Sequence, residues 1–215
     1  MELNDSTENN KIRIKIILIG AVGVGKTNLI NVTLGKKFEQ NPISTQSGSY
    51  TESQYKSKNG RIYFFDIWDT CGHEIYRSIT KLFIKGSKIV LVVYSINDRE
   101  SFEEIDYWIN LVRENLGKET NDYILALVGN KCDLYENEQV VPDEEAINIA
   151  NSYNIKFKLT SALTEAESFK LFLNELIEDY IQLIGPERGR LLLSHSIKLN
   201  KGDLKKLNKK KCCKS

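Results

Sequence analysis

The sequence has few cysteines and no long apolar segment, and each absence excludes a class of protein. Its four cysteines among 215 residues stand at positions 71, 132, 212 and 213, which is neither a disulfide framework nor the spacing of a zinc site. The longest apolar runs, such as residues 16–22 and 89–94, are far shorter than the roughly 20 residues that span a bilayer. The polar, acidic start has neither a secretory signal nor a myristoylation site. We therefore expect a cytosolic protein without a membrane-spanning helix.

The composition is that of a folded domain whose charge is unevenly placed. Apolar residues make up 41% and charged residues 27%, which excludes a wholly disordered or collagen-like chain. The net charge is +1, but residues 187–215 hold ten lysines and arginines against two acids. The remainder has twenty basic and twenty-seven acidic residues, which argues against a nucleic-acid surface on the fold. The basic end suits an anionic lipid surface or a solvated linker.

Short apolar runs alternate along the chain with segments of helical period. The pattern predicts strands at residues 15–20, 88–96, 123–129 and 155–159, and helices at residues 29–34, 102–112, 143–153 and 165–184. Residues 49–55 and 61–68, separated by Lys58-Asn59-Gly60, predict a β-hairpin, since Asn-Gly supplies the positive φ that such turns need. The alternation predicts an α/β fold with a mostly parallel sheet. We place a disordered lead-in at 1–10, one domain at 11–186 and a flexible tail at 187–215.

The strongest motif is a glycine-rich loop between the first strand and the first helix. Residues 20–27, Gly-Ala-Val-Gly-Val-Gly-Lys-Thr, match the pattern G-x-x-x-x-G-K-[ST]. Small residues let backbone N–H groups surround phosphate oxygens, and the start of a helix adds its positive dipole end. Lys26 can reach the β- and γ-phosphates, and the Thr27 hydroxyl can bind Mg²⁺. The motif predicts a nucleoside triphosphate site, against the simpler alternative of a tight connection.

A second motif, at residues 130–133, indicates which base is bound. Asn-Lys-Cys-Asp follows the apolar run at 124–129, and the carboxylate of Asp133 can accept hydrogen bonds from N1–H and the 2-amino group of guanine. Adenine has an acceptor at N1, so it would leave that carboxylate unpaired at a high cost. Residues 160–162, Thr-Ser-Ala, can offer backbone N–H groups to the guanine oxygen. A polar loop would explain the four residues alone, but their position after a buried strand favours guanine.

A third group of residues can sense the γ-phosphate. Asp69, directly after an apolar strand, can hold Mg²⁺ through water, and Gly72 can offer its N–H to the γ-phosphate. Thr45 lies in a polar loop and can add a second hydroxyl to the metal. Because these γ-phosphate contacts are lost on hydrolysis, the pattern predicts a switch with two states.

At this point the chain resembles the Ras superfamily of small GTPases over residues 11–184, and within it the Rab proteins. The resemblance is carried by residues 67–70 (Ile-Trp-Asp-Thr), 76–80 (Tyr-Arg-Ser-Ile-Thr), 85–87, 93–96, 128–134 and 160–162. It implies a P-loop G domain in three layers, with six strands and five helices. It also implies a monomeric GTP hydrolase with Mg²⁺, exchange factors, activating proteins and effectors, acting in vesicle trafficking.

The resemblance also implies the residues of the site. Phe38 sits where the family places an aromatic ring edge against guanine, although an ordinary core phenylalanine is the alternative. The metal ligands implied are Thr27, Thr45 and Asp69, and the catalytic residues are Lys26 and His73. The nucleotide site implied is Val22, Gly23, Val24, Gly25, Lys26, Thr27, Asn28, Phe38, Thr45, Asp69, Gly72, Asn130, Lys131, Asp133, Ser161, Ala162 and Leu163.

Four departures from the family pattern qualify this interpretation. His73 stands where the family has a water-orienting Gln, and Val22 stands where a small residue is usual. A β-branched Val22 crowds the space that a water-orienting residue or an arginine finger must enter, so we expect slow GTP hydrolysis. The loop at 45–50, Thr-Gln-Ser-Gly-Ser-Tyr, differs from the Rab-typical Thr-Ile-Gly-x-Asp-Phe, and Pro42 before it replaces a common Tyr. Leu163 stands where a Lys often packs near the base.

The end of the chain resembles a prenylation signal. Cys212 and Cys213 follow three lysines, as in the paired-cysteine ends of Rab proteins, and Cys212 also fits a C-a-a-X frame. Two lipid chains with a basic lead-in would anchor the protein stably to the cytoplasmic face of intracellular membranes, from which it would cycle with the cytosol. Four alternatives stay open: a P-loop kinase or ATPase, a scaffold that holds GTP without hydrolysing it, a Ras- or Rho-like signalling GTPase, and a soluble form without lipid.

Overall fold

A six-stranded sheet with the strand order β2-β3-β1-β4-β5-β6 forms the centre of the computed structural model. The structure describes residues 13–40, 42, 45, 48–71, 77–117 and 122–185. The strands pair in parallel except for β2 and β3, which are antiparallel, so the predicted mostly parallel α/β sheet is confirmed. Their bounds are β1 (Arg13–Ile19), β2 (Ser49–Lys56), β3 (Ile62–Asp69), β4 (Ile89–Ser95), β5 (Ile124–Asn130) and β6 (Lys156–Leu159).

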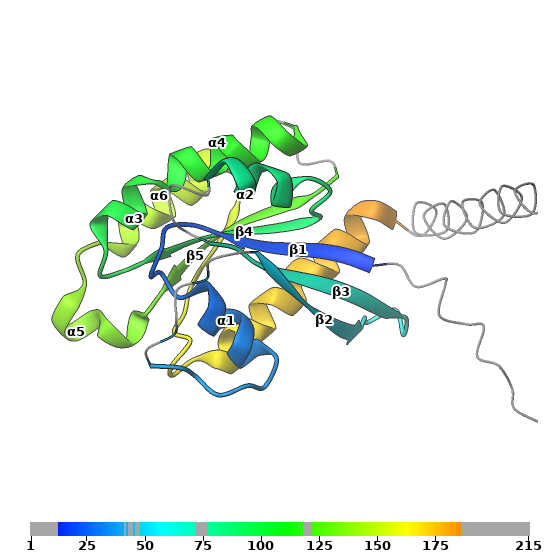
Figure 1. The fold of residues 1–215 in the computed structure, drawn as a ribbon, viewed down its shortest axis with the longest axis horizontal. Coiled ribbons are helices and arrows are strands. Elements are labelled where there is room, and N and C mark those ends of the chain that lie inside the picture. Colours follow the sequence, from blue (N-terminus) through cyan, green and yellow to red (C-terminus); the bar gives the residue numbers. More distant parts are fainter. Residues whose placement is uncertain are drawn as a thin grey trace, which may run out of the picture.

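Helices cover both faces of the sheet and complete the three layers (Figure 1). The helices are α1 (Lys26–Thr33), α2 (Arg77–Ile84), α3 (Arg99–Glu103), α4 (Ile105–Leu116), α5 (Tyr135–Glu138), α6 (Asp143–Tyr153) and a C-terminal helix described over residues 166–185. If α3 and α4 are counted as one interrupted helix and the single turn α5 is set aside, the described residues contain the five helices expected. None of these described helices is long and apolar enough to cross a bilayer.

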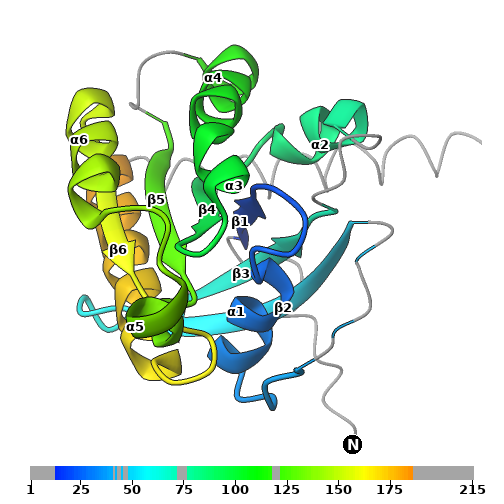
Figure 2. The ribbon, with the colours of Figure 1, turned by 90° about the vertical axis from the view of Figure 1, so that its left-hand side faces the viewer.

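The sheet separates two apolar cores because its central strands are buried on both faces. In β1, Ile16 and Leu18 point into one core, whereas Ile17 and Ile19 point into the other. The first core is closed by α1 and the C-terminal helix, and the second by α2, α3, α4 and α6, which lie on the opposite face of the sheet (Figure 2). This two-sided burial explains why the central strands have continuous apolar sequences.

Two local predictions differ from the structure in detail. The predicted hairpin across residues 58–60 is confirmed, since Ser57 N–H donates to the Arg61 carbonyl, but of the Asn-Gly pair expected to supply the positive φ, Gly60 alone has one, of 81°. The helix expected at 102–112 begins earlier, at Arg99, where Asp98 caps α3 by accepting from the N–H of Ser101, and it is divided at Glu104 into α3 and α4.

A buried carboxylate joins the β2–β3 turn to the C-terminal helix. Glu178 is only 7% exposed and accepts hydrogen bonds from the Tyr55 hydroxyl at 3.0 Å, the Ser57 hydroxyl at 3.0 Å and the Lys58 N–H at 2.8 Å. Burial raises the pKa of Glu178, but these hydrogen bonds to its charged form outweigh burial and lower the pKa below its ordinary value. The contact lies at the amino end of β3, away from the loops that carry the sequence motifs.

The loops that follow β1, β3, β4, β5 and β6 meet at one edge of the sheet. These five strands are parallel, so their carboxyl ends all lie on that edge. Ligands bind at this edge in open parallel sheets, at a point where the strand order reverses, as it does here between β1 and β4. The topology therefore brings the motifs at 20–27, 69, 130–133 and 160–162 together.

Candidate nucleotide site

The backbone conformation of the glycine-rich loop could not form if two of its glycines carried a side chain. Gly25 has a φ of 95°, and a Cβ there would lie 2.3 Å from Nδ2 of Asn130. Gly20 has a φ of 142°, and its Cβ would lie 2.0 Å from the Val93 carbonyl oxygen. Helix α1 begins directly after Gly25, and no side chain caps that end. The N–H groups of its first turn therefore remain available to an anion in the loop.

Lys26 holds the loop closed around its own ammonium group. Its side chain is buried, with Lys26 5% exposed, and Nζ donates to the carbonyl oxygens of Gly20 at 2.9 Å and Ala21 at 2.7 Å. Burial lowers the pKa of Lys26 to about 8, although the nearby carboxylate of Asp69 works in the opposite direction. An anion bound in the loop would favour the charged ammonium further.

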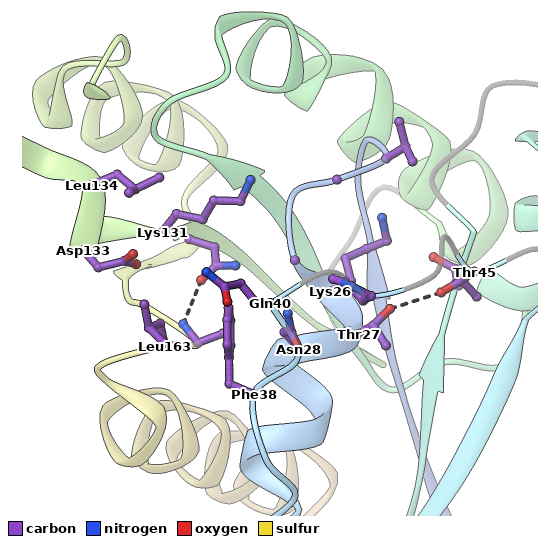
Figure 3. A pocket seen from close by; sticks show the side chains of 17 residues that line it. Lys26, Thr27, Asn28, Phe38, Gln40, Thr45, Lys131, Asp133, Leu134 and Leu163 are labelled. Atoms are coloured by element: carbon purple, nitrogen blue, oxygen red, sulfur yellow. Dashed lines mark hydrogen bonds between the residues drawn. The ribbon is translucent and has the colours of Figure 1, made fainter. Parts of the chain in front are cut away.

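Three oxygen-bearing side chains from three separate segments meet beside this lysine. The Thr27 hydroxyl donates to Oδ2 of Asp69 at 2.8 Å, and the Thr45 hydroxyl lies 3.2 Å from the same oxygen. The two hydroxyl oxygens are 3.1 Å apart, and a dashed line joins them in Figure 3. Oδ1 of Asp69 is buried and has no hydrogen-bond partner among the described residues. Burial raises the pKa of Asp69, and the threonine hydrogen bonds and Lys26 oppose that rise.

This oxygen cluster fits a magnesium ion. Mg²⁺ prefers oxygen ligands, keeps several waters and is typically held by one carboxylate, hydroxyls and phosphates. Asp69 offers an unpartnered buried oxygen, which is costly to leave unsatisfied without a cation or water. The donor set of Thr27, Thr45 and Asp69 therefore suits the metal predicted from the sequence.

Asn130 connects the phosphate side of the site to the other loops. Its side chain is buried, with Asn130 1% exposed, and Nδ2 donates to the Val24 carbonyl at 2.8 Å. Oδ1 accepts from the N–H of Ala162 at 3.1 Å. One carboxamide thus ties the loop after β1 to the loops after β5 and β6.

Asp133 is oriented by a chain of hydrogen bonds from the loop after β6. The hydroxyl of Ser161 accepts from the N–H groups of Leu163 at 3.0 Å and Thr164 at 3.1 Å. Its own hydrogen is donated to Oδ1 of Asp133 at 2.5 Å. The second carboxylate oxygen of Asp133 stays available to a ligand, since Asp133 lines the cavity.

These groups surround one cavity of about 320 Å³, seen from close by in Figure 3. Ligand sites of small molecules usually begin at about this size. Most of the predicted site residues line this cavity, and they come both from the glycine-rich loop and from the motif at 130–133. The lining residues are Val22, Gly23, Gly25, Lys26, Thr27, Asn28, Phe38, Gln40, Pro42, Thr45, Thr70, Asn130, Lys131, Asp133, Leu134, Ala162 and Leu163.

Residues 15–182 match the Ras family of proteins. The chain belongs to the Ras family. It is 33% identical over 189 residues to a probable Rab-related GTPase of Acanthamoeba polyphaga mimivirus, which covers 87% of this chain and 85% of that protein. It is 31% identical over 211 residues to the Ras-related protein Rab11B of Nicotiana tabacum (94% and 93%), and 38% identical over 149 residues to Rab-11B of Dictyostelium discoideum (69% and 66%). The predicted resemblance is confirmed: the chain is a divergent Rab-like small GTPase.

Not every residue expected in this Ras-family site lines its cavity. Val24 is fully buried and contributes its carbonyl to Asn130, while Ser161 is fully buried behind Asp133. Asp69 is buried beside the cavity, where it reaches Thr27. Gly72, His73, Cys212 and Cys213 lie outside the described residues, as do the lead-in, the tail and the predicted domain boundaries.

The cavity includes four residues that the sequence did not single out for the nucleotide. Gln40 and Pro42 follow Phe38 in the loop after α1, and Leu134 follows Asp133 in the 3₁₀ turn Cys132–Leu134. Thr70 follows the predicted metal ligand at 69, and its hydroxyl donates to the Leu18 carbonyl at 2.7 Å. Thr70 and Leu134 directly adjoin a predicted site residue, whereas Gln40 and Pro42 lie between Phe38 and Thr45 and had no such signal for the nucleotide.

Proposed function

We propose that this Rab-like GTPase binds GTP and GDP in this cavity and changes state with the γ-phosphate. The observation that carries the proposal is the position of Asn130, which joins Val24 of the glycine loop to Ala162 of the loop after β6. This buried tie fixes the distance between the groups suited to phosphates and the carboxylate suited to guanine. A tight strand-to-helix connection would not require it.

At the phosphate end, the chain supplies positive charge and free donors. The ammonium of Lys26, which now donates to Gly20 and Ala21, would turn to the β- and γ-phosphates, and the first-turn N–H groups of α1 would bind the remaining oxygens. Thr27, Thr45 and Asp69 would hold Mg²⁺, which supplies charge neutralisation between the phosphates when bound. Gly72 would donate its N–H to the γ-phosphate.

At the base end, the chain supplies the groups that select guanine. Asp133 would accept from N1–H and the 2-amino group, while the N–H of Ala162 lies on the loop that would meet the guanine oxygen. Phe38 and Lys131 line the cavity on the way to Asp133 and would flank the base. A P-loop kinase or ATPase would not need the carboxylate at 133.

Competition between nucleotides tests this proposal directly. The nucleotide-free protein is titrated with a fluorescent GDP analogue, which is then displaced by GDP, GTP, ADP or ATP. We expect displacement by the guanine nucleotides at concentrations at least about 100-fold lower than by the adenine nucleotides. Equal displacement by ATP would favour the kinase or ATPase alternative, and absence of binding by folded protein would refute the site.

We propose further that GTP hydrolysis is slow. Val22 is 42% exposed at the cavity, so its branched side chain occupies space next to the phosphate loop. His73 would orient the attacking water through a neutral ring nitrogen, in place of a glutamine. Single-turnover hydrolysis is compared between the wild type and the Val22→Gly/His73→Gln variant, with Val22→Gly alone separating the two causes. We expect faster hydrolysis in the double variant; equal rates would remove the idea.

A scaffold that holds GTP permanently is the second candidate, and Val22 together with His73 favours it. The two candidates differ in the nucleotide that the protein carries after purification. A switch with slow hydrolysis carries GDP or a mixture, and its GTP fraction falls during incubation. A permanent scaffold retains GTP unchanged over the same period.

The segment after Thr45 provides a surface for effectors that would respond to the bound nucleotide. Tyr50, near the start of β2, is 53% exposed and stacks on Trp68 with ring centroids 5.1 Å apart. Exposed aromatic side chains are typical anchors of protein interfaces. Loss of the Thr45 contact on hydrolysis would release the chain that leads to Tyr50, so partners that need this surface would distinguish the two states.

We propose a role in vesicle trafficking from a lipid-anchored state. The relatives named Rab11B and Rab-11B support a trafficking role, and the basic end with Cys212 and Cys213 supports prenylation. A fluorescently tagged protein is localised beside a Cys212→Ser/Cys213→Ser variant, and intact mass is measured for both. We expect membrane localisation and added prenyl mass in the wild type alone. A cytosolic wild type of unmodified mass would support the soluble alternative.

A further inference from the structure

Asn28, in the first turn of α1, makes a reciprocal pair of hydrogen bonds with the backbone of one distant residue. Nδ2 of Asn28 donates to the Glu39 carbonyl at 2.8 Å, and Oδ1 accepts from the Glu39 N–H at 3.1 Å. Asn28 is 5% exposed whereas Glu39 is exposed, so the two bonds are shielded from water mainly on the side of Asn28. The carboxamide therefore pairs with this peptide as a neighbouring strand would.

The segment that Asn28 holds has little other support. Residues 36–39 form no helix or strand, and the N–H groups of Gly35 and Lys36 bond back to the end of α1. Within the described part of the chain, the only hydrogen bonds found for residues 37–40 are the two between Glu39 and Asn28. Hydrogen bonds thus fix the segment at one point, Glu39.

The residue next to that point is Phe38, which faces two environments. It packs against the core beneath α1 and the C-terminal helix, and it also lines the cavity. Figure 3 shows Phe38 standing beside Asn28, on the side of the cavity that leads to Asp133. Because Phe38 and Glu39 share a peptide bond, an anchor on Glu39 restricts where the Phe38 ring can lie.

We infer that Asn28 is a positioning residue for nucleotide retention: its carboxamide holds Glu39 so that Phe38 stays against the base. This inference rests on the proposed function of the cavity. It assigns to the Asn28 side chain a role apart from the phosphates, which its backbone N–H would serve. One residue then links the phosphate end and the base end of the site.

The chemistry of asparagine suits this role better than that of similar side chains. A carboxamide offers one acceptor and one donor at the spacing of a peptide group. Aspartate lacks the donor, serine can satisfy one of the two peptide groups, and glutamine is longer by one methylene. Alanine would leave both the N–H and the carbonyl of Glu39 without their buried partner.

Loss of the anchor should be visible as faster release of nucleotide. When the segment is free to move, only the fraction of molecules with Phe38 in place retains the base normally, and the apparent affinity falls by that fraction. From the usual net value of two neutral hydrogen bonds, Asn28→Ala should release GDP about 10- to 100-fold faster.

A double-mutant cycle tests whether Asn28 acts through Phe38. Dissociation of a fluorescent GDP analogue is measured for the full chain as wild type, Asn28→Ala, Phe38→Ala and the double variant. We expect Asn28→Ala to change the rate by no more than about threefold when Phe38 is already absent. The same large acceleration in both backgrounds would show that Asn28 acts on the phosphate end, and would overturn the inference.

Two further measurements separate this role from general destabilisation. Tyr55→Phe removes a hydrogen bond to Glu178 far from the cavity, and we expect it to lower the thermal midpoint without changing GDP release. Hydrogen exchange at the Glu39 amide should become fast in Asn28→Ala, or in the milder Asn28→Ser if the alanine variant does not fold. Unchanged protection of Glu39 would overturn the inference.

Binding and release of GDP by the wild type and by Asn28→Ala distinguish failure of this inference from failure of the proposed function. If the wild type binds no guanine nucleotide, the proposed function fails, and the inference fails with it even where Glu39 is protected by Asn28. If the wild type binds GDP and Asn28→Ala releases it at the wild-type rate, the proposed function stands and the inference alone is refuted.

Discussion

Substitution of Asp133 by Asn should reverse the base preference of the cavity. Ser161 donates its only hydroxyl hydrogen to Oδ1 of Asp133, because its oxygen already accepts from the N–H groups of Leu163 and Thr164. In Asp133→Asn that hydrogen can still be donated to the amide oxygen. The amide NH₂ would then replace the carboxylate oxygen that faces the ligand.

The magnitude follows from the two hydrogen bonds that guanine would lose. Hydrogen bonds to a charged group contribute about 1.5–3 kcal/mol each, so two correspond to about 3–6 kcal/mol. This predicts that GDP binds Asp133→Asn roughly 10²- to 10⁴-fold more weakly than it binds the wild type. Xanthine has a carbonyl where guanine has its 2-amino group, so the new NH₂ should favour xanthosine diphosphate.

Calorimetric titration of both proteins with GDP and with xanthosine diphosphate measures this reversal. Ser161→Ala is the matched control, because it keeps the carboxylate but removes the hydrogen bond that orients it. We expect the control to lose about tenfold in GDP affinity without any gain for xanthosine diphosphate. GDP affinity within about threefold of wild type in folded Asp133→Asn, or equal loss of both ligands, would refute the reasoning.

Three further predictions concern the metal, the β2–β3 turn and the glycine loop. Removal of Mg²⁺ with a chelator should speed GDP release by about tenfold or more, and Thr27→Ala with Mg²⁺ present should reproduce part of that effect; unchanged release in both cases contradicts the metal site. Glu178→Ala should lower the free energy of unfolding by about 2–4 kcal/mol at pH 7, because hydrogen bonds from the β2–β3 turn lose their charged acceptor. Since these bonds hold the pKa of Glu178 below its ordinary value, its stabilisation is present above the unfolded-state pKa of about 4.3 and is lost as the pH falls through the lower folded-state pKa. Urea denaturation of both proteins between pH 3 and 7 checks this, and a gap that does not narrow in acid contradicts it. Gly20→Ala should destabilise the protein by about 3 kcal/mol or more, because its Cβ would lie 2.0 Å from the Val93 carbonyl oxygen; a thermal midpoint equal to that of wild type contradicts this.

Most of the fold could be predicted because its signals are local. The helix predicted at 143–153 from its amphipathic pattern has the bounds of α6, whose first turn is acidic and which ends at Asn154 with a left-handed φ of 53°. The strands at 88–96 and 123–129 were predicted within one residue at each end of β4 and β5, because continuous apolar runs mark strands buried on both faces.

The predictions that differed in detail were those that depended on contacts between segments. The hairpin turn at 58–60 was predicted from its residues, but its support by Glu178, which lies about 120 residues later in the chain, was not. The helix α2 was not assigned from its residues. The division at Glu104 was not predicted either, because the helical period of the apolar residues runs through it.

The sequence by itself determined which groups the site offers: the glycine-rich loop, the carboxylate proposed for guanine and the hydroxyls proposed for Mg²⁺ are properties of residue types at fixed local spacing. The tertiary structure alone decided how these groups relate. Asn130 binds Val24 and Ala162, and Asn28 binds the backbone of Glu39, although nothing in the local pattern distinguishes either side chain as a link between loops. Such links depend on which loops a parallel sheet brings to one edge, and only the folded chain sets those distances.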